Sequence, residues 1–322
     1  MHFTSIPDNY SPLAKPLLYG FVFDAEQKVV DVKIVDVTHD RTLGVRRFYD
    51  MQSGEIDIAP YLKRCFDPKP VDGGTAIVDA EGFYFVIAVE VNGERSESRY
   101  FSPYSIRDGE GTIFRSAVKR QTLARDESDC IILYAPNGGH VGCELYASEQ
   151  MCGQFEFEVE YSPGLQILKI EPTLFDVEFD TMIINVGVDG IEDFLTYRIV
   201  DNSELSRRLM WCDADGMLQF YTFPTCRSRH SRVTKQHLET EQGLRVTSCE
   251  VESLLTLVSD YETVAEMERL GNILESEFVW LDRGVDSVRV DVVSTESIVR
   301  YGGALNSLQV DIRAYNRKEA RV

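Results

Sequence analysis

Apolar and polar residues alternate with a period of two over much of this chain, which is the pattern of half-buried β-strands. Residues 29–37 place Val30, Val32 and Ile34 on one face and charged side chains on the other. Asn92-Gly93 follows the apolar residues 82–91 and is the strongest hairpin signal in the sequence. Short strands without long helices between them predict a β-sandwich for the first hundred residues.

The same alternation returns further along, with acidic residues on its polar side. Phe155, Phe157, Val159 and Tyr161 fall on one face of a predicted strand, and glutamates fill the other face at positions 156, 158 and 160. Residues 128–148 predict two strands around a turn at 137–139. We therefore expect a second β domain with an acidic outer face, in which the glutamates are a solvated strand surface.

After residue 200 the pattern becomes mixed. Residues 209–223 predict a hairpin of two aromatic-rich strands around Asp213-Ala214-Asp215-Gly216, where Gly216 can take the positive φ of a tight turn. A polar stretch follows, and then a helix near 259–275, for which Ser259 and Glu262 have the spacing of a capping box. Further strands are predicted at 277–282, 287–294 and 307–315.

These elements predict a mainly β fold, with two consecutive β-sandwich-like domains followed by an α+β domain that has one principal helix. The predicted ranges are residues 1–104, 105–200 and 201–322. A chain of 322 residues agrees with two or three domains of roughly 100–150 residues each. Residues 54–67 add a strand that enters a short helix, with Pro60 in its first turn.

The net charge and the cysteine content limit the classes of function and the cellular location that the sequence allows. The formal net charge of −20 argues against general nucleic-acid binding, and no apolar run is long enough to span a bilayer. The seven cysteines are odd in number and form no C-x-x-C pair, which favours free thiols in a reducing compartment. The first residues lack the features of a secretion signal, so we expect no export and no membrane insertion.

No recognised catalytic pattern is present. The phosphate-binding, dinucleotide-binding, serine-hydrolase and zinc-protease motifs are all missing, and the five histidines show no ligand spacing. Asp213-Ala214-Asp215-Gly216 begins like a calcium loop but lacks the later ligands, so turn chemistry explains it better. The sequence therefore predicts no enzyme activity, no cofactor and no metal site.

Two groups of residues are candidates for contacts with a partner. Arg227, Arg229 and Arg232 form a basic run in an acidic chain, and a solvated loop, a docking surface for an acidic neighbour and a nucleic-acid contact are the three interpretations. An acidic middle domain of an identical subunit would be a suitable neighbour. The second group consists of aromatic residues that would be either core or interface anchors: Trp211, Phe220, Tyr221 and Trp280.

Five segments resemble tail- and baseplate-associated structural proteins of Bacteroidetes phages and prophages. They are IPDNYSPLAKPLLYGFVF at 6–23, LGVRRFYDMQSGEIDIAPYLK at 43–63, LMWCDADGMLQFYTF at 209–223, LESEFVWL at 274–281 and ALNSLQVDIRAY at 304–315. The resemblance implies a virion protein that assembles in the cytoplasm through protein–protein interaction with other tail or baseplate proteins or identical subunits. It implies no catalytic residue.

Two other functions remain open from the sequence. A β-sandwich with exposed aromatic residues is also typical of a carbohydrate-binding protein, in which Trp211 or Trp280 would stack on a glycan. A hydrolase would require two carboxylates at glycosidase spacing in a cleft lined by aromatic rings. Our first hypothesis is the non-enzymatic structural subunit, because nothing in the sequence marks an active site.

Overall fold

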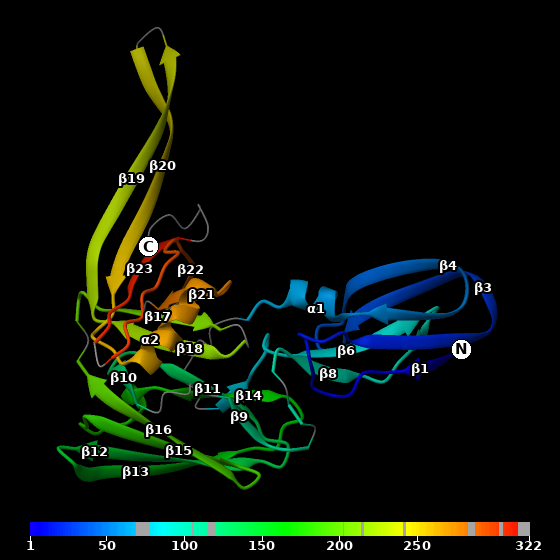
Figure 1. Ribbon diagram of the computed structural model, residues 1–322, viewed down its shortest axis with the longest axis horizontal. Helices are drawn as coiled ribbons and strands as arrows, with labels where there is room; N and C mark the ends of the chain where they lie inside the picture. Colours follow the sequence, from blue (N-terminus) through cyan, green and yellow to red (C-terminus); the bar gives the residue numbers. More distant parts are fainter. Residues whose placement is uncertain are drawn as a thin grey trace.

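The computed structural model describes residues 1–68, 77–104, 106–107, 109–114, 120–201, 203–213, 216–240, 243–282, 287–302 and 305–314. Within these ranges the chain folds into four β-sheets with two short α-helices (Figure 1). The prediction of a mainly β, multidomain protein built from β-sandwiches is confirmed. The sheets group into three units, which we call the first, second and third unit in chain order.

The first unit is a seven-stranded sheet around a single core. Val30, Val32 and Ile34 are buried in that core, as the alternation predicted. Asn92 and Gly93 both have positive φ and form the expected turn between β6 and β7. The helix α1 (Ala59–Cys65) begins with Pro60 in its first turn. The strands are β1 (His2–Ser5), β2 (Ser11–Pro12), β3 (Leu18–Asp36), β4 (Arg41–Asp57), β6 (Phe85–Val91), β7 (Glu94–Arg95) and β8 (Arg99–Ser102).

The second unit consists of two sheets that share one apolar core. The smaller sheet has the order β5-β14-β11-β9 and the larger has the order β10-β16-β15-β12-β13. The strands of the smaller sheet are β5 (Ile77–Asp79), β9 (Thr112–Phe114), β11 (Asp129–Tyr134) and β14 (Leu165–Ile170). Those of the larger sheet are β10 (Arg120–Ala124), β12 (Gly139–Ala147), β13 (Gln150–Val159), β15 (Thr181–Val188) and β16 (Ile191–Val200).

Two connections in the second unit cross between sheets. The turn at 137–139 joins β11 to β12, but these strands belong to different sheets and do not pair with each other. Strand β5 lies inside the range predicted for the first domain, yet it pairs with β14 of the second unit. The chain therefore enters the second unit, returns to the first sheet for β6, and enters the second unit again. The three predicted domain ranges stay a prediction.

The third unit is a seven-stranded sheet of order β18-β17-β21-β22-β23-β20-β19, with a helix on its core. The predicted hairpin at 209–223 is confirmed as the antiparallel pair β17 and β18. The strands are β17 (Arg207–Cys212), β18 (Leu218–Phe223), β19 (Thr225–Thr240), β20 (Gly243–Val258), β21 (Val279–Asp282), β22 (Ser287–Val292) and β23 (Gln309–Ala314). The 3-10 turns are η1 (Pro172–Leu174) and η2 (Asn272–Leu274).

The principal helix starts later than the capping pattern predicted. It is α2 (Val264–Gly271), and Thr263 is its N-cap: the Thr263 side chain accepts a hydrogen bond from the Glu266 amide at 3.3 Å. The proposed cap at Ser259 is wrong, because the Ser259 hydroxyl instead accepts the Leu308 amide at 2.8 Å in a tertiary contact. The spacing of residues in the sequence could not show that the Ser259 hydroxyl accepts a hydrogen bond from a distant residue.

The polar stretch after the hairpin is not a loop. Residues 225–240 and 243–258 pair along their whole length as β19 and β20, with bulges at Cys226/Ser228 and Gln236/His237. Only the base of this ribbon is packed, because β23 pairs with β20 over residues 254–258. We call the unpacked part, residues 229–240 and 243–251, the arm. The interpretation of the basic run as a loop is therefore corrected.

The three units have different positions in the molecule (Figure 1). The arm projects from the third unit at one end, and the sheet containing β12 and β13 lies at the opposite end. A shared apolar cluster joins the units, and it contains Tyr10 of the first unit, Tyr134 of the second and Trp280 of the third. The ring centroids of Tyr10 and Tyr134 are 4.6 Å apart.

Candidate interaction surfaces

The aromatic candidates of the sequence lie mostly inside the molecule. Trp211 is completely buried in the core of the third unit, where the Arg269 guanidinium stacks 5.6 Å from the centre of its indole ring. Phe220 and Trp280 are also buried, in the cluster that joins the units. Of the two interpretations, core packing is the one that this burial supports.

Both faces of β17 are buried, which explains why its aromatic residue is not exposed. Leu209 and Trp211 point into the core of the third unit, whereas Met210 and Cys212 alternate with them and pack against the second unit. A strand buried on both faces carries an almost continuous apolar run. The run LMWC in the sequence is therefore typical of a central strand rather than of a docking ribbon.

Tyr221 is half-buried and is held by two hydrogen bonds. Its hydroxyl donates to Glu262 at 2.7 Å and accepts from the Asp260 amide at 3.0 Å. Burial, together with the hydrogen bond to Glu262, raises the pKa of Tyr221 well above its usual range. Burial also raises the pKa of the Glu262 carboxyl. The side chain that looked like an interface anchor fastens β18 to the segment before α2.

The turn between β17 and β18 has the chemistry that the sequence predicted, as far as it is described. Asp213 accepts hydrogen bonds from the Met217 amide at 2.9 Å and from the Gln219 side chain at 3.0 Å. Gly216 has φ of 80°. Ala214 and Asp215 lie outside the described residues. Both oxygens of Asp213 are thus engaged in holding the turn.

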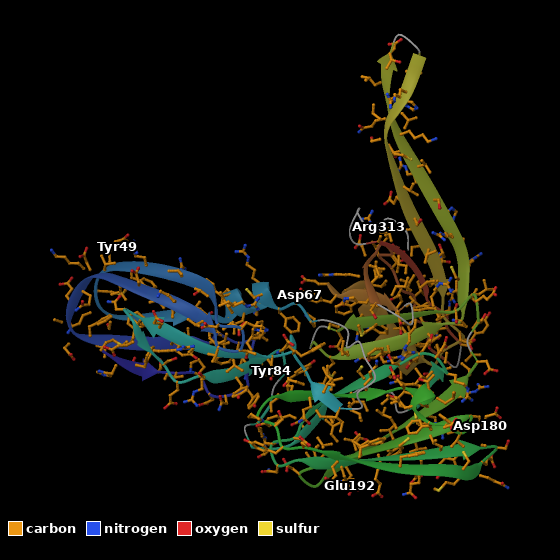
Figure 2. All side chains as sticks on the ribbon, turned by 180° about the vertical axis from the view of Figure 1, so that it is seen from behind. Tyr49, Asp67, Tyr84, Asp180, Glu192 and Arg313 are labelled. Carbon is orange, nitrogen blue, oxygen red and sulfur yellow. The ribbon has the colours of Figure 1, made fainter. Side chains whose placement is uncertain are left out.

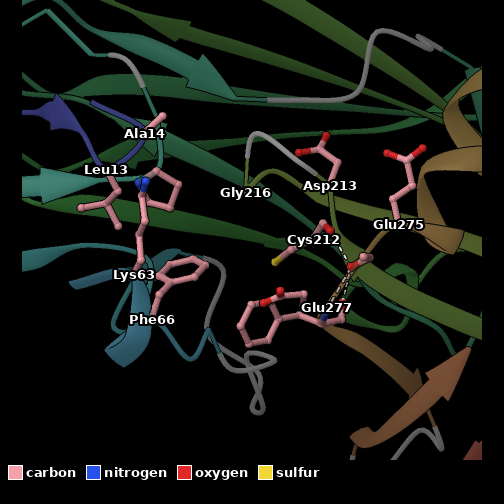
Figure 3. A pocket seen from close by; sticks show the side chains of 12 residues that line it. Leu13, Ala14, Lys63, Phe66, Cys212, Asp213, Gly216, Glu275 and Glu277 are labelled. Carbon is pink, nitrogen blue, oxygen red and sulfur yellow. Dashed lines mark hydrogen bonds between the residues drawn. The ribbon is translucent and has the colours of Figure 1, made fainter. Parts of the chain in front are cut away.

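A cleft of about 460 Å³ lies between the first and third units. Lys63 and Phe66 from the first unit face Glu275 and Glu277 from the third across it (Figure 3). This cleft contains carboxylates and aromatic rings together, which is one part of what the hydrolase alternative requires, the other being glycosidase spacing between two carboxylates. Asp213 also lines it, but its oxygens are bonded within the turn.

The three candidate arginines all lie on β19. Arg227 sits at the bulge near the base and donates to the Gln309 side chain at 3.3 Å. Arg229 and Arg232 are exposed on the arm, as are Lys235 and Arg245. None of the four arm cations forms an ion pair with a side chain that the structure describes. The basic run therefore places exposed cations on a projecting element (Figure 2).

The arm also has an apolar row along one face. Val233 lies directly opposite Val251, and Val246 lies opposite His237, which follows Val233 on the same face of β19. On β20 this row continues toward the base into Leu255, which is buried in the core of the third unit. Along the arm itself Val233 is 50% exposed, Val246 47% and Leu244 74%. The row of apolar side chains that faces the core at the base of the ribbon is therefore exposed to solvent along the arm.

A second unusual surface lies along β13, at the margin of the larger sheet of the second unit. Strand β13 pairs with β12 on one side, and its other side has no neighbour among the described strands. Met151 and Phe155 on β13 are 52% and 36% exposed, and Leu174 of η1 is 46% exposed nearby, next to Phe175, which packs on Phe155. The acidic edge consists of this strand together with the exposed carboxylates on it and next to it: Glu149, Glu156, Glu158, Glu160 and Glu178.

The sequence predicted the charged residues of the arm and of the acidic edge, but it did not predict that the arm is a projecting two-stranded ribbon. The exposure of Glu156, Glu158 and Glu160 and the burial of Val159 agree with the predicted strand faces, but Phe155 and Tyr161, which were predicted on the apolar face, are 36% and 69% exposed. The arm was missed because both of its faces are exposed, so β19 has no regular alternation. The available signal was its partner strand: residues 244–258 are rich in valine, leucine and threonine, which favour strands.

The described residues contain no group of three or more histidine, cysteine, aspartate or glutamate side chains placed to hold a metal ion. Among the helices that the structure describes, none has the length and apolar character needed to cross a membrane.

No protein-family model matches the chain. No curated protein matches it either. The similarity to the three solved structures described next is distant. The chain is similar to a crystal structure of Dpr2 Ig1-Ig2 in complex with DIP-Theta Ig1-Ig3, with 8% identity and a TM-score of 0.22, covering 98% of this chain and 89% of that one.

Two further structures are similarly distant. Native alpha-2-macroglobulin of E. coli gives 7% identity and a TM-score of 0.20, over 99% of this chain and 27% of that one. The endo-fucoidan hydrolase MfFcnA4 of glycoside hydrolase family 107 gives 9% identity and a TM-score of 0.17, over 89% and 42%. Likeness at this level assigns neither a family nor a function.

Proposed function

We propose that this chain is a non-enzymatic structural subunit of a phage or prophage tail or baseplate assembly, and that it binds its neighbours through the arm. The observation that carries the proposal is an arm whose two faces and free edge are all exposed. The resemblance of five segments to tail- and baseplate-associated proteins supports this kind of assembly. The expected location is the cytoplasm during assembly and then the virion.

The physical argument begins with the stability of a two-stranded ribbon. Fixing the backbone of one residue costs about 1–2 kcal/mol, and an isolated hairpin is at best marginally stable in water. Residues 229–239 are all exposed, so no core offsets this cost along the arm. A long unpaired edge is also a template for pairing with another chain. Such an element is stabilised when a partner covers it.

The alternatives have less support from the geometry. Carbohydrate binding was expected to use Trp211 and Trp280, but both indoles are buried and neither can stack on a sugar ring in this conformation. The hydrolase alternative depends on the cleft with Glu275 and Glu277, and no neighbouring feature identifies a substrate. Neither alternative gives the exposed arm a role, whereas the assembly function does.

Particle incorporation tests the proposal. We would co-express the chain with the products of its flanking genes and isolate particles by sedimentation. The test variant replaces residues 232–252 by Asn-Gly, which joins Ser231 and Ser253, two residues that face each other across the ribbon. The full chain should sediment with particles, and the shortened chain should remain in the supernatant.

The control changes surface charge elsewhere: Arg46→Glu on β4 together with Lys28→Glu on β3, two exposed cations of the first unit. This variant should be incorporated normally. Equal incorporation of the shortened and full chains would contradict a role for the arm. Absence of tail or baseplate genes beside the coding sequence would contradict the phage assignment.

A further inference from the structure

The arm and the acidic edge have opposite charge and lie on the same polypeptide. Arg229, Arg232, Lys235 and Arg245 are the exposed cations of the arm, and the sequence of residues 229–251 has 4 Lys+Arg against 3 Glu, a net charge of +1. The second range predicted from the sequence, residues 105–200, has 7 Lys+Arg against 17 Asp+Glu, a net charge of −10. Opposite charges at these two sites would attract each other when two copies meet.

The two surfaces also match in length and in apolar content. Strand β13 has 10 residues, and residues 229–239 of the arm form an exposed run of similar length, roughly 35 Å at 3.3 Å per residue. Each has a free edge at the end of its sheet. Val233 and Val246 on the arm correspond to Met151 on the acidic edge, so each surface combines exposed apolar and charged side chains.

The two surfaces of one copy cannot meet. The arm leaves the third unit in the direction away from the second unit, and Asp180 and Glu192 mark the far end of the molecule (Figure 2). A contact between the arm and the acidic edge therefore has to form between copies. Such a contact is heterologous, because it uses a different surface on each partner, and it repeats from copy to copy.

We propose that the arm of one copy docks on the acidic edge of a second copy, with its cations against Glu156, Glu158 and Glu160 and its apolar row against Met151. This inference rests on the proposed assembly function and names the partner as a second copy of this chain. Repetition of the contact links the subunits head to tail.

Two cysteines provide a direct test. Cys249 lies on the arm and Cys152 lies on β13, and they are the only cysteines of the described residues that are classed as exposed. We would treat the protein at millimolar concentration and low salt with a bismaleimide reagent. The proposal predicts a ladder of cross-linked oligomers, and mass spectrometry of its peptides should join Cys152 to Cys249.

Single substitutions give the geometry of the contact. Cys152→Ser and Cys249→Ser should each abolish the ladder. A mixture of the two variants should give one cross-linked dimer and nothing larger, because each copy then retains only one of the two exposed cysteines. A ladder that joins Cys249 to Cys249, or to another cysteine, would overturn the acidic edge as the docking site.

Charge reversal tests the recognition itself. Arg232→Glu with Lys235→Glu should reduce the cross-linked yield about tenfold, because like charges now face each other. Glu156→Lys with Glu158→Lys should do the same, and mixing the two double variants should restore part of the yield. The control, Arg46→Glu with Lys28→Glu, changes the net charge equally outside the contact and should leave the yield unchanged.

The outcomes separate this inference from the function on which it rests. If no Cys152–Cys249 product forms while the shortened chain still fails to enter particles, the partner of the arm is a different protein and the inference is wrong. If the shortened chain enters particles normally, the assembly function of the arm itself fails. Unchanged cross-linking in both double variants would also overturn the inference.

Discussion

The guanidinium of Arg208 in the third unit lies 3.5 Å from the Glu127 carboxylate of the second unit, and all of this contact is buried. Asp129, also of the second unit, lies 3.6 Å from the same guanidinium. Arg208 further donates to the Ser128 carbonyl at 2.9 Å and to the Thr222 hydroxyl at 2.8 Å. One arginine thus connects two units through charges that are withdrawn from water.

Removing Arg208 should destabilise the protein strongly. In Arg208→Ala two buried carboxylates lose their cation, and breaking a buried pair in this way costs about 3–5 kcal/mol of unfolding free energy. The matched control is Arg313→Ala, since Arg313 also contacts two carboxylates but is exposed, and such pairs contribute about 0–1 kcal/mol. Urea unfolding measures both. Equal losses would contradict a special role for the buried pair.

The same variant should also show a changed pH dependence. Burial raises the pKa of Asp129 above its ordinary value of 3.8, and Arg208 opposes this rise. Without Arg208 the folded pKa rises further, so the folded state binds more protons than the unfolded state between the two pKa values. Arg208→Ala should therefore regain stability, relative to the unchanged protein, as the pH is lowered through the raised pKa of Asp129. Parallel stability curves would contradict this.

The two tryptophans should behave as core residues in solution. Trp211 is 0% and Trp280 5% exposed, so iodide should quench their fluorescence only weakly until urea unfolds the chain. Trp211→Ala should lower the unfolding free energy by about 3–5 kcal/mol through the cavity it leaves. Tyr301→Ala, at a 72% exposed aromatic residue, should change it by no more than about 0.5 kcal/mol. Strong quenching in the native protein would argue for exposed indoles.

His39 should titrate above the ordinary histidine value. Its ring contacts Glu81 at 3.0 Å and Asp36 at 2.9 Å through its two nitrogens, and these contacts raise the pKa of His39 above 6.5. The stabilisation from the charged ring is complete below the unfolded pKa and is lost as the pH rises through the folded pKa. NMR titration of the ring should show the shift. Glu81→Gln should move the pKa back toward 6.5, and no movement would exclude Glu81 as the main cause.

The arm should contribute little to the stability of the isolated chain. Its side chains are exposed, so replacing residues 232–252 by Asn-Gly should change the midpoint of thermal unfolding only slightly. In hydrogen exchange the amides of residues 231–239 should exchange faster than those of residues 254–258, which also pair with β23. Slow exchange throughout the arm at low protein concentration would mean that it is stabilised within one copy.

Local patterns predicted local structure well. Asn92-Gly93 formed its turn, Pro60 entered the first turn of α1, and Val30, Val32 and Ile34 share a buried face. These features depend on neighbours within a few residues, which the sequence displays directly. The cap of α2 failed because Thr263 and Ser259 are both suitable, and a tertiary hydrogen bond to Leu308 decided between them.

For the arm and the acidic edge, the sequence predicted the charged residues but not the structure that presents them. Arg229 and Arg232 were recognised as unusual in an acidic chain, and Glu156 and Glu158 as a solvated face. That the arginines lie on a projecting ribbon did not follow, because a strand exposed on both faces lacks alternation. That Trp211 is core did not follow either, because a hairpin of its composition fits a core or an interface equally well.

The sequence by itself determined a mainly β chain, the faces of several strands and the separation of acidic from basic segments, because period-two alternation and charge are written residue by residue. Only the tertiary structure decided which sheets the strands join, that β17 is covered on both sides, and that β19 and β20 leave the core as an arm. These outcomes depend on contacts between residues far apart in the chain, which no local pattern contains.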